Sequence, residues 1–380
     1  MNFYAIVSEF NPFHTGHKYL IEKTKADTNT QGIVCIMSGS MVQRGDIAIY
    51  DKWTRAKAAV ENGADLVVEL PTCYVLQSAD IFAKGAVEIA NLMGAEGISF
   101  GSECTDEALL KKIALLKVNE PPEYKDALSE ALDRGMGYPA ACQNALKSIL
   151  KDVPDCIAAP NTTLGISYMS AIQKINPSMK VNIVKRIGDY HSTDITKKFA
   201  SATAIRQNIL SDDKSSDFAL CTSDEIYDIN RISPYILGFF RTANEDMLSH
   251  IVGMEPGLGQ RLISKSKECS TFDEFVAAVI TKRYTAHRIR RVILCSILGI
   301  NEAPSPTYVR VLALNNNGAK MLKNIKQTDN IEVITKLSDS GQKESKMLQY
   351  DIRSTDIAAL CIPKKASMDF TTAPAVIGKE

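Results

Sequence analysis

The sequence lacks a long apolar run, and this absence bears on where the protein acts. No stretch approaches the roughly 20 uninterrupted apolar residues that a membrane helix needs. The first residues also lack a basic segment followed by an apolar run, which is the pattern of a secretion signal. We therefore expect a soluble cytoplasmic protein with no membrane partner.

Paired cysteines are missing as well, although the chain holds nine cysteines. They are scattered, odd in number and never arranged as a CxxC pair. This pattern is typical of reduced thiols, and it excludes a disulfide framework and a zinc knuckle. We expect no metal site built from protein side chains.

Net charge is also lacking, because 44 Lys and Arg residues balance 44 Asp and Glu residues. A nucleic-acid partner would therefore bind a local basic patch rather than the field of the whole protein. The hydrophobic share of 45% and the charged share of 23% exclude collagen-like, coiled-coil and wholly disordered chains. At about 150 residues per domain, the 380 residues predict two or three packed units.

Short apolar runs alternate with amphipathic segments over the first half of the chain. The runs predict five buried strands, at residues 3–7, 32–37, 64–70, 96–100 and 180–186. The segments between them have helical spacing, at residues 15–25, 52–62, 78–93, 108–116 and 163–175. Strands that are apolar on both faces and separated by helices indicate a parallel sheet covered on both sides. The predicted class is α/β, a Rossmann-like parallel sheet of about five strands flanked by helices.

The rest of the chain predicts a helical insertion and a second domain. Residues 118–150 are polar and helical, so we place them as an insertion before the last strand. The polar run at residues 211–217 marks the boundary between a first domain at 1–212 and a C-terminal domain at 213–380. The second domain is predicted to be mostly helical to residue 300. A small α+β unit follows, with a strand at 308–314, a helix at 318–325 and a strand at 331–335.

The first predicted strand ends in an HxGH motif that contains His14, Gly16 and His17. Ligands of open parallel sheets bind at the carboxyl ends of the strands, where a helix N-terminus offers N–H groups to phosphate. Two imidazoles three residues apart can flank one phosphate and stabilise charge that develops on it. A metal-binding pair or ordinary surface histidines are the alternatives. We favour nucleotide binding, since only five histidines exist and two fall at this strand end.

A second phosphate motif follows the fifth predicted strand. Ser201 or Thr203 can cap the next helix, and Arg206 can bind a pyrophosphate through two hydrogen bonds. Arg186 ends the strand, where its cation would face the same cleft. The alternative is that Ser201 and Thr203 are only helix caps and that Arg186 only caps the strand.

Three charged residues, Asp51, Lys52 and Arg55, follow the second predicted strand. Their place at a strand's carboxyl end would let them contact the substrate. A charged helix start is more often a solvated face, and this alternative stays open.

The HxGH motif and the Ser-x-Thr-x-Ile-Arg motif at residues 201–206 resemble those of the nucleotidylyl-transferase superfamily, which includes the class I aminoacyl-tRNA synthetases. Longer segments are similar to the bacterial tRNA(Met) cytidine acetate ligase family, at residues 7–20, 37–48, 51–55, 62–71, 100–103, 160–168 and 189–192. Residues 283–300 and 308–314 are similar too, so the resemblance covers nearly the whole chain.

The resemblance implies an ATP-dependent acetate ligase. Such an enzyme activates acetate as acetyl-adenylate with release of pyrophosphate. It then transfers the acetyl group to N4 of the wobble cytidine of elongator tRNA(Met), which gives N4-acetylcytidine and AMP. ATP with Mg²⁺ is the implied cofactor, acetate and elongator tRNA(Met) are the implied partners, and no protein partner is expected. His14 and His17 are the implied catalytic residues.

By position, the resemblance also implies a set of ATP contacts. They fall on Val7, Ser8, Glu9, Phe10, Asn11, Pro12, Phe13, His14, Thr15, Gly16, His17, Lys18, Tyr19, Leu20, Gly101, Asn161 and Arg186. Ser201, Thr203 and Arg206 are the further candidates for phosphate binding. The sequence departs from the family at Thr162 and Thr163, where an Asn and an aliphatic residue are expected. This departure leaves open which of Asn161 and Thr162 makes the polar contact.

A basic stretch at residues 282–291 carries five lysines and arginines, and no Asp or Glu occurs from residue 275 to 301. Charge of one sign beside an aromatic residue suits RNA phosphates and bases. The expected tRNA contacts are Arg283, Arg288, Arg290 and Arg291.

Two other functions compete with acetate ligation. A small-molecule adenylyltransferase of coenzyme biosynthesis would use the same phosphate motifs, but it would leave residues 211–380 without a role. A non-catalytic RNA-binding protein would not need both histidines together with Arg186 and Arg206.

Overall fold

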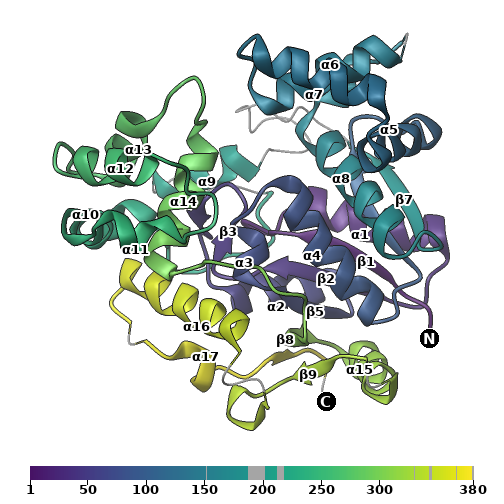
Figure 1. The fold of residues 1–380 in the computed structure, drawn as a ribbon. Helices are drawn as coiled ribbons and strands as arrows, with labels where there is room; N and C mark the ends of the chain where they lie inside the picture. Colours follow the sequence, from purple (N-terminus) through teal and green to yellow (C-terminus); the bar gives the residue numbers. More distant parts are fainter. Residues whose placement is uncertain are drawn as a thin grey trace.

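The computed structural model describes residues 1–150, 152–186, 202–211, 218–328, 330–341, 345–364 and 366–378. Its centre is an eight-stranded sheet in the order β10-β8-β5-β2-β1-β6-β7, with β9 paired to β8 (Figure 1). The five predicted strands are β1 (Tyr4–Ser8), β2 (Ile33–Ser38), β5 (Leu66–Leu70), β6 (Gly97–Ser102) and β7 (Lys180–Lys185). All neighbouring pairs among these five are parallel, which confirms the predicted fold class.

The strand order changes direction at β1. From β1 the chain moves to β2 and β5 on one side, and then to β6 and β7 on the other. Such a switch opens a crevice at the carboxyl ends of the strands, and ligands of this fold class bind there. The HxGH motif directly follows β1, so the topology places it at this crevice.

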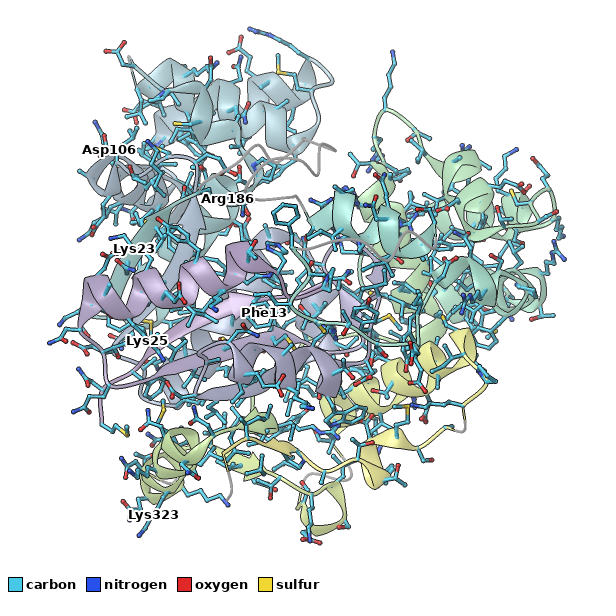
Figure 2. All side chains as sticks on the ribbon, turned by 180° about the vertical axis from the view of Figure 1, so that it is seen from behind. Phe13, Lys23, Lys25, Asp106, Arg186 and Lys323 are labelled. Carbon is cyan, nitrogen blue, oxygen red and sulfur yellow. The ribbon has the colours of Figure 1, made fainter. Side chains whose placement is uncertain are left out.

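Helices cover both faces of the sheet, as the apolar strands predict. Helices α3 (Thr72–Val75), α4 (Ala79–Leu92), α5 (Glu107–Asn119) and α8 (Pro160–Ile175) pack on one face. Helices α1 (Thr15–Thr28) and α2 (Lys52–Glu61) cover the other face, where Figure 2 shows Lys23 and Lys25 on α1. Alternate residues of β1 serve the two cores, since Ala5 packs with the first set and Ile6 with the second.

A hairpin and an insertion interrupt this pattern. Strands β3 (Met41–Val42) and β4 (Asp46–Ile47) pair as a small antiparallel hairpin between β2 and α2. Helices α6 (Pro122–Asp133) and α7 (Tyr138–Ile149) form the predicted helical insertion, which rises beyond the sheet edge (Figure 1). A short 3-10 helix, η1 (Asp155–Ala158), leads from the insertion into α8.

The C-terminal region is mostly helical to residue 298, as predicted. After α9 (Ala202–Leu210) it contains η2 (Ile229–Ile232), α10 (Ser233–Thr242), α11 (Glu245–Ser249), α12 (Leu258–Ser266), α13 (Phe272–Val279) and α14 (Ala286–Leu298). Within the part of the chain that the structure describes, every helix is too short or too polar to cross a membrane.

The predicted α+β unit exists, but its strands extend the central sheet. It consists of β8 (Tyr308–Leu314), α15 (Asn316–Thr328) and β9 (Glu332–Ile334), followed by η3 (Leu337–Asp339), α16 (Lys346–Ala358), η4 (Ala359–Cys361), α17 (Met368–Thr371) and β10 (Ala375–Val376). Strand β8 pairs antiparallel with β5, and β9 and β10 pair with β8. The C-terminal residues therefore cover the β5 edge that a five-stranded sheet would leave open.

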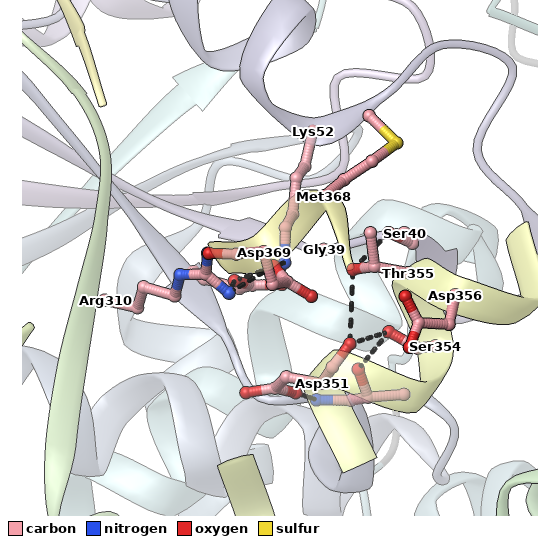
Figure 3. Close-up of polar contacts among 12 residues, drawn as sticks. Gly39, Ser40, Lys52, Arg310, Asp351, Ser354, Thr355, Asp356, Met368 and Asp369 are labelled. Carbon is pink, nitrogen blue, oxygen red and sulfur yellow. Dashed lines mark hydrogen bonds and ion pairs between the residues drawn. The ribbon is translucent and has the colours of Figure 1, made fainter. Parts of the chain in front are cut away.

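Four buried charges join the C-terminal residues to the first half of the chain, and Figure 3 labels Lys52, Arg310 and Asp369 among them. Lys52 Nζ lies 2.7 Å from Glu69 Oε1 and 2.8 Å from Asp369 Oδ1, and Arg310 also pairs with Asp369. Their side chains are 0 to 5% exposed. These residues come from α2, β5, α17 and β8, so we call them the four-charge cluster.

Neither alternative for the charged start of α2, a substrate contact or a solvated face, fits Lys52 and Arg55, because both side chains are fully buried and hold the fold. Lys52 belongs to the four-charge cluster, and Asp51 caps α2 by accepting a hydrogen bond from Thr54 N at 2.8 Å. Arg55 is fully buried. Its guanidinium donates to the carbonyls of Glu9 at 2.5 Å and Ser38 at 3.1 Å, which fixes the chain just after β1 and at the end of β2.

Candidate functional site

A cavity of about 380 Å³ lies at the carboxyl ends of β1, β6 and β7. Figure 2 shows Arg186 at the end of β7, on the side of the sheet from which the helical insertion rises. A volume of this size suits a small-molecule ligand. The cavity therefore occupies the crevice that the strand order predicts.

Most of the expected nucleotide contacts line this cavity. They are Val7, Ser8, Glu9, Phe10, Asn11, His14, Gly16, His17, Tyr19, Leu20, Gly101, Asn161, Arg186, Thr203 and Arg206. Pro12, Phe13, Thr15 and Lys18 are not part of the lining, and Phe13 is fully buried in the core. Ser201 and residues 189–192 lie outside the described residues.

His14 and His17 form a stacked pair at the start of α1. His14 Nδ1 accepts a hydrogen bond from Gly16 N at 3.0 Å, and His17 Nδ1 accepts one from His14 N at 3.3 Å. The ring centroids are 3.8 Å apart. Because both Nδ1 atoms accept, each neutral ring carries its proton on Nε2. Two Nε2–H donors therefore remain for a ligand in the cavity.

Both histidines are held in the neutral form. Burial, followed by the positive charges of Arg186 and Arg206, lowers the pKa of His14 to about 3. Burial, followed by His14 and Arg186, lowers the pKa of His17 well below its usual value. Near neutral pH the pair can therefore offer two N–H donors without positive charge, an arrangement that suits charge developing on a phosphate oxygen.

The backbone of the HxGH motif is fixed by a segment that follows α9. Thr15 N donates to the carbonyl of Phe218 at 3.2 Å, and Leu220 N donates to the carbonyl of Phe13 at 3.0 Å. These bonds set the direction in which the chain enters α1. The backbone that carries the two imidazoles is consequently held in place, as a preorganised site requires.

Arg186 and Arg206 bring two guanidinium groups to the cavity. Arg206 donates to the carbonyl of Asn11 at 2.7 Å and to Thr203 Oγ1 at 3.2 Å. Arg186 Nε lies 3.5 Å from Glu103 Oε1, and a Cβ at Gly101 would lie only 3.2 Å from Arg186 Cγ. The glycine therefore lets Arg186 lie close against β6. Thr203 is the second residue of α9, so it lies in the first turn of that helix.

Of Asn161 and Thr162, only Asn161 lines the cavity. Its Nδ2 donates to Glu103 Oε1 at 2.6 Å. Thr162 is fully buried, and its backbone N–H and hydroxyl both bond to Glu103 Oε2. Thr162 therefore ties the start of α8 to the end of β6, and the polar group available to a ligand is that of Asn161.

The cavity also has a wall that sequence reasoning missed. Gln43, Arg44 and Asp46 from the β3–β4 hairpin line it, as do Phe82 of α4 and Tyr168 of α8. The hairpin follows β2, and its position after a strand at the same sheet edge was the available signal. In the sequence this segment carries only the family resemblance at residues 37–48, and no residue of it was named as a site candidate.

The described residues contain no group of three or more His, Cys, Asp and Glu side chains that could hold a metal ion. The carboxylates that line the cavity within this part of the chain are Glu9 and Asp46. Mg²⁺ in nucleotide sites is commonly held by phosphate oxygens with one or two carboxylates. Glu9 and Asp46 are therefore the described carboxylates of the lining that could contact a Mg²⁺ ion bound with a nucleotide.

The basic stretch expected to bind tRNA adjoins this hairpin. Arg283 and Arg288 share the carboxylate of Glu255, and their side chains are 72% and 33% exposed. Arg290 is 17% exposed and pairs with Asp46 and Asp273 at 2.9 and 2.7 Å. The stretch therefore has an exposed end at Arg283 and an end that is packed against the cavity wall.

Known proteins are similar in sequence to this chain over nearly its whole length. A family model described as HIGH Nucleotidyl Transferase matches residues 1–372. The tRNA(Met) cytidine acetate ligase of Clostridium perfringens is 34% identical, covering 99% of this chain and 100% of that protein. The enzyme of the same name from Acetivibrio thermocellus is 34% identical, covering 98% of this chain and 99% of the relative.

Solved structures agree with the sequence comparison. Thermotoga maritima TmcAL bound with alpha-thio ATP superposes with a TM-score of 0.89 at 26% identity, covering 99% of both chains. The apo form of that protein gives a TM-score of 0.90, again over 99% of both chains. The chain therefore belongs to the tRNA(Met) cytidine acetate ligase family of HIGH nucleotidyl transferases.

Proposed function

We propose that this protein is an ATP-dependent acetate ligase that acetylates N4 of the wobble cytidine of elongator tRNA(Met) in the cytoplasm. The observation that carries the proposal is the stacked pair of neutral imidazoles, which lines one cavity together with Arg186 and Arg206. The relatives support it, since they bear the corresponding name and a structural neighbour was solved with an ATP analogue.

The first half-reaction needs alignment and charge stabilisation. The acetate carboxylate attacks the α-phosphorus of ATP, and the bond to pyrophosphate breaks. The histidine Nε2–H groups and the two arginines would stabilise the negative charge on the phosphate oxygens. Mg²⁺ bound with ATP would supply further charge neutralisation. No covalent bond to the protein forms in this step, so the mechanism needs no nucleophilic side chain.

The second half-reaction explains why acetate is first activated. The lone pair of the cytosine N4 amine is conjugated with the ring, so the amine is a poor nucleophile. It attacks the acetyl carbon of the mixed anhydride, AMP leaves, and the amine loses a proton. The cavity would limit access of water to the anhydride during this step.

The exposed end of the basic stretch is the proposed contact for tRNA. Arg283 and Arg288 share one carboxylate, so the pair keeps one excess positive charge for RNA phosphates. Tyr284 lies against both guanidinium groups, at 5.6 and 5.1 Å from its ring centroid. Such aromatic and cationic side chains are common where proteins contact single-stranded RNA loops.

The position of the label in an acetate-transfer assay tests the proposal. The protein is incubated with labelled acetate, ATP and elongator tRNA(Met), and in parallel with tRNA in which the wobble cytidine is replaced by uridine. We expect label on the first tRNA as N4-acetylcytidine and none on the second. Transfer of an adenylyl group to a small-molecule acceptor, without acetate in the product, would contradict the proposal in favour of a coenzyme adenylyltransferase.

Replacing Arg186 or Arg206 with Lys should weaken ATP binding. The charge is kept but the planar fork is lost, so a bidentate phosphate contact cannot form. A hydrogen bond to a charged group contributes about 1.5 to 3 kcal/mol, which corresponds to roughly 10- to 150-fold in affinity. The measurement is ATP affinity by calorimetry.

Arg241→Lys is the matched control for these two variants. Arg241 donates to the carbonyls of Ser266 and Cys269, and it is not part of the cavity lining. Its replacement should leave ATP affinity unchanged. Normal ATP affinity in both Arg186→Lys and Arg206→Lys would exclude bidentate recognition by these residues.

A further inference from the structure

Side chains of α14 hold three consecutive backbone carbonyls of the β3–β4 turn. Arg291 donates to the carbonyl of Gln43 at 3.2 Å, and Arg290 Nε donates to that of Gly45 at 3.2 Å. His287 Nδ1 lies 3.3 Å from the carbonyl of Arg44. Because a carbonyl only accepts, this ring nitrogen must carry the proton. We call residues 43–46 the 43–46 loop.

Each of the three nitrogens of the Arg290 guanidinium has a protein partner. Its Nε bonds to Gly45, one terminal nitrogen to Asp273 at 2.7 Å and the other to Asp46 at 2.9 Å. The guanidinium also lies 4.6 Å from the centre of the Phe272 ring. Three of its five N–H donors are used, and the side chain is only 17% exposed, so little of the guanidinium is accessible to an RNA phosphate.

The loop and the helix are in direct contact at Gly45. Its φ is +77°, in the left-handed region that favours glycine. A Cβ there would lie 2.6 Å from both Arg290 Cβ and the backbone nitrogen of Arg291. The turn therefore cannot keep its place on α14 if this residue gains a side chain.

The other side of the 43–46 loop faces the cavity. Gln43, Arg44 and Asp46 belong to the cavity lining. The backbone N–H of Gln43 donates to Glu9 Oε1 at 2.6 Å, and Glu9 also lines the cavity. A continuous path of hydrogen bonds thus runs from Arg291 through Gln43 to a carboxylate beside the HxGH motif.

We infer that Arg290 and Arg291 are positioning residues for acetyl transfer, which hold the 43–46 loop and through it Glu9 at the cavity, and that they are not RNA contacts. The inference rests on the proposed function. Arg288, a proposed RNA contact, belongs to the same helix. Helix α14 thus connects the proposed RNA contact to the wall of the cavity. A bound tRNA would therefore be held at a fixed position relative to the reacting groups.

Steady-state kinetics and salt titrations on three variants test this inference. Arg291→Met removes the bond to Gln43, and Gly45→Ala pushes the loop from α14 without removing any charge. In both, we expect kcat for tRNA acetylation to fall between about 10- and 100-fold, because small misplacements of reacting groups have effects of this size. The KM for tRNA and the slope of tRNA affinity against salt should not change. Arg283→Met should behave in the opposite way, with a raised KM and a salt slope smaller by about 0.7 to 0.9.

The outcomes separate the possible roles. A smaller salt slope in Arg291→Met, with kcat kept, would make Arg291 an RNA contact and overturn the inference. Unchanged kcat in both Arg291→Met and Gly45→Ala would overturn it as well. If Arg291→Met fails to fold, Arg291→Lys replaces it, since the lysine keeps the charge and can still reach the Gln43 carbonyl; it should retain more of kcat than Gly45→Ala. Failure of the wild-type protein to acetylate tRNA would instead reject the proposed function itself.

Discussion

Replacing His14 with Asn, or His17 with Gln, is expected to lower acetate-dependent ATP consumption by about 100- to 1000-fold, the usual effect of losing one preorganised donor to a developing oxyanion. The side-chain oxygens of Asn and Gln can still accept the backbone N–H bonds that the two Nδ1 atoms accept now. Asn and Gln are also common at these capping positions. The variants therefore remove the Nε2–H donors and keep the start of α1.

The measurement is pyrophosphate release with acetate and ATP, together with the far-UV spectrum and the thermal unfolding midpoint. His250→Asn is the control, since His250 is exposed at the end of α11 and is not part of the cavity lining. Because the two rings stack at 3.8 Å and act on one site, the double variant should lose little more than either single variant. Wild-type turnover in both single variants would remove the histidines from the catalytic site.

Replacing Lys52 with Met should destabilise the fold by about 3 to 5 kcal/mol, as happens when one member of a buried ion pair is removed. The ammonium is fully buried between Glu69 and Asp369. Without it, two buried carboxylates share the single guanidinium of Arg310, which pairs directly with Asp369. The measurement is the free energy of unfolding by urea denaturation.

A second variant identifies the cause of this loss. Lys52→Met combined with Glu69→Gln leaves Arg310 and Asp369 as one ion pair whose charges cancel. Part of the lost stability should therefore return. Lys57→Met is the control on the same helix, because Lys57 is 58% exposed and its ion pair with Glu61 is a surface pair of little energetic weight. Equal stability of Lys52→Met and Lys57→Met would show that the four-charge cluster does not stabilise the fold.

The sequence predicts correctly the features that depend on residues close together in the chain. The five parallel strands and the start of α1 follow from runs of apolar residues and their spacing, and the HxGH motif fell at the predicted strand end. The pairing of β8 with β5 could not be predicted, since nothing in either segment identifies its neighbour across more than 200 residues of chain. The burial of Lys52 could not be predicted for the same reason, because one of its two carboxylate partners is Asp369. Arg55 is buried because it bonds to the carbonyls of Glu9 and Ser38, and the sequence does not show that these carbonyls surround it.

The residues of the cavity also divide into those that a local motif predicts and those that only the fold brings there. His14, His17 and Arg206 belong to recognisable phosphate motifs, and the structure brings them to one cavity. The 43–46 loop belongs to no such motif, and its position depends on carbonyl contacts with a helix about 245 residues later in the chain. The RNA role expected for Arg290 rests on the lack of Asp and Glu from residue 275 to 301. In the folded chain, Asp46 and Asp273 lie close enough to form ion pairs with it.

The pairing of β5 with β8 has a consequence for synthesis on the ribosome, where domains form as the N-terminal residues emerge first. The five parallel strands are complete once residue 185 has emerged, but Arg310 and Asp369 follow much later. Until then Lys52 and Glu69 lack two of the partners that surround them in the finished protein, and the β5 edge exposes unpaired backbone groups. A nascent chain halted before residue 308 would therefore present an open strand edge to neighbouring chains, which is the situation that chaperones shield.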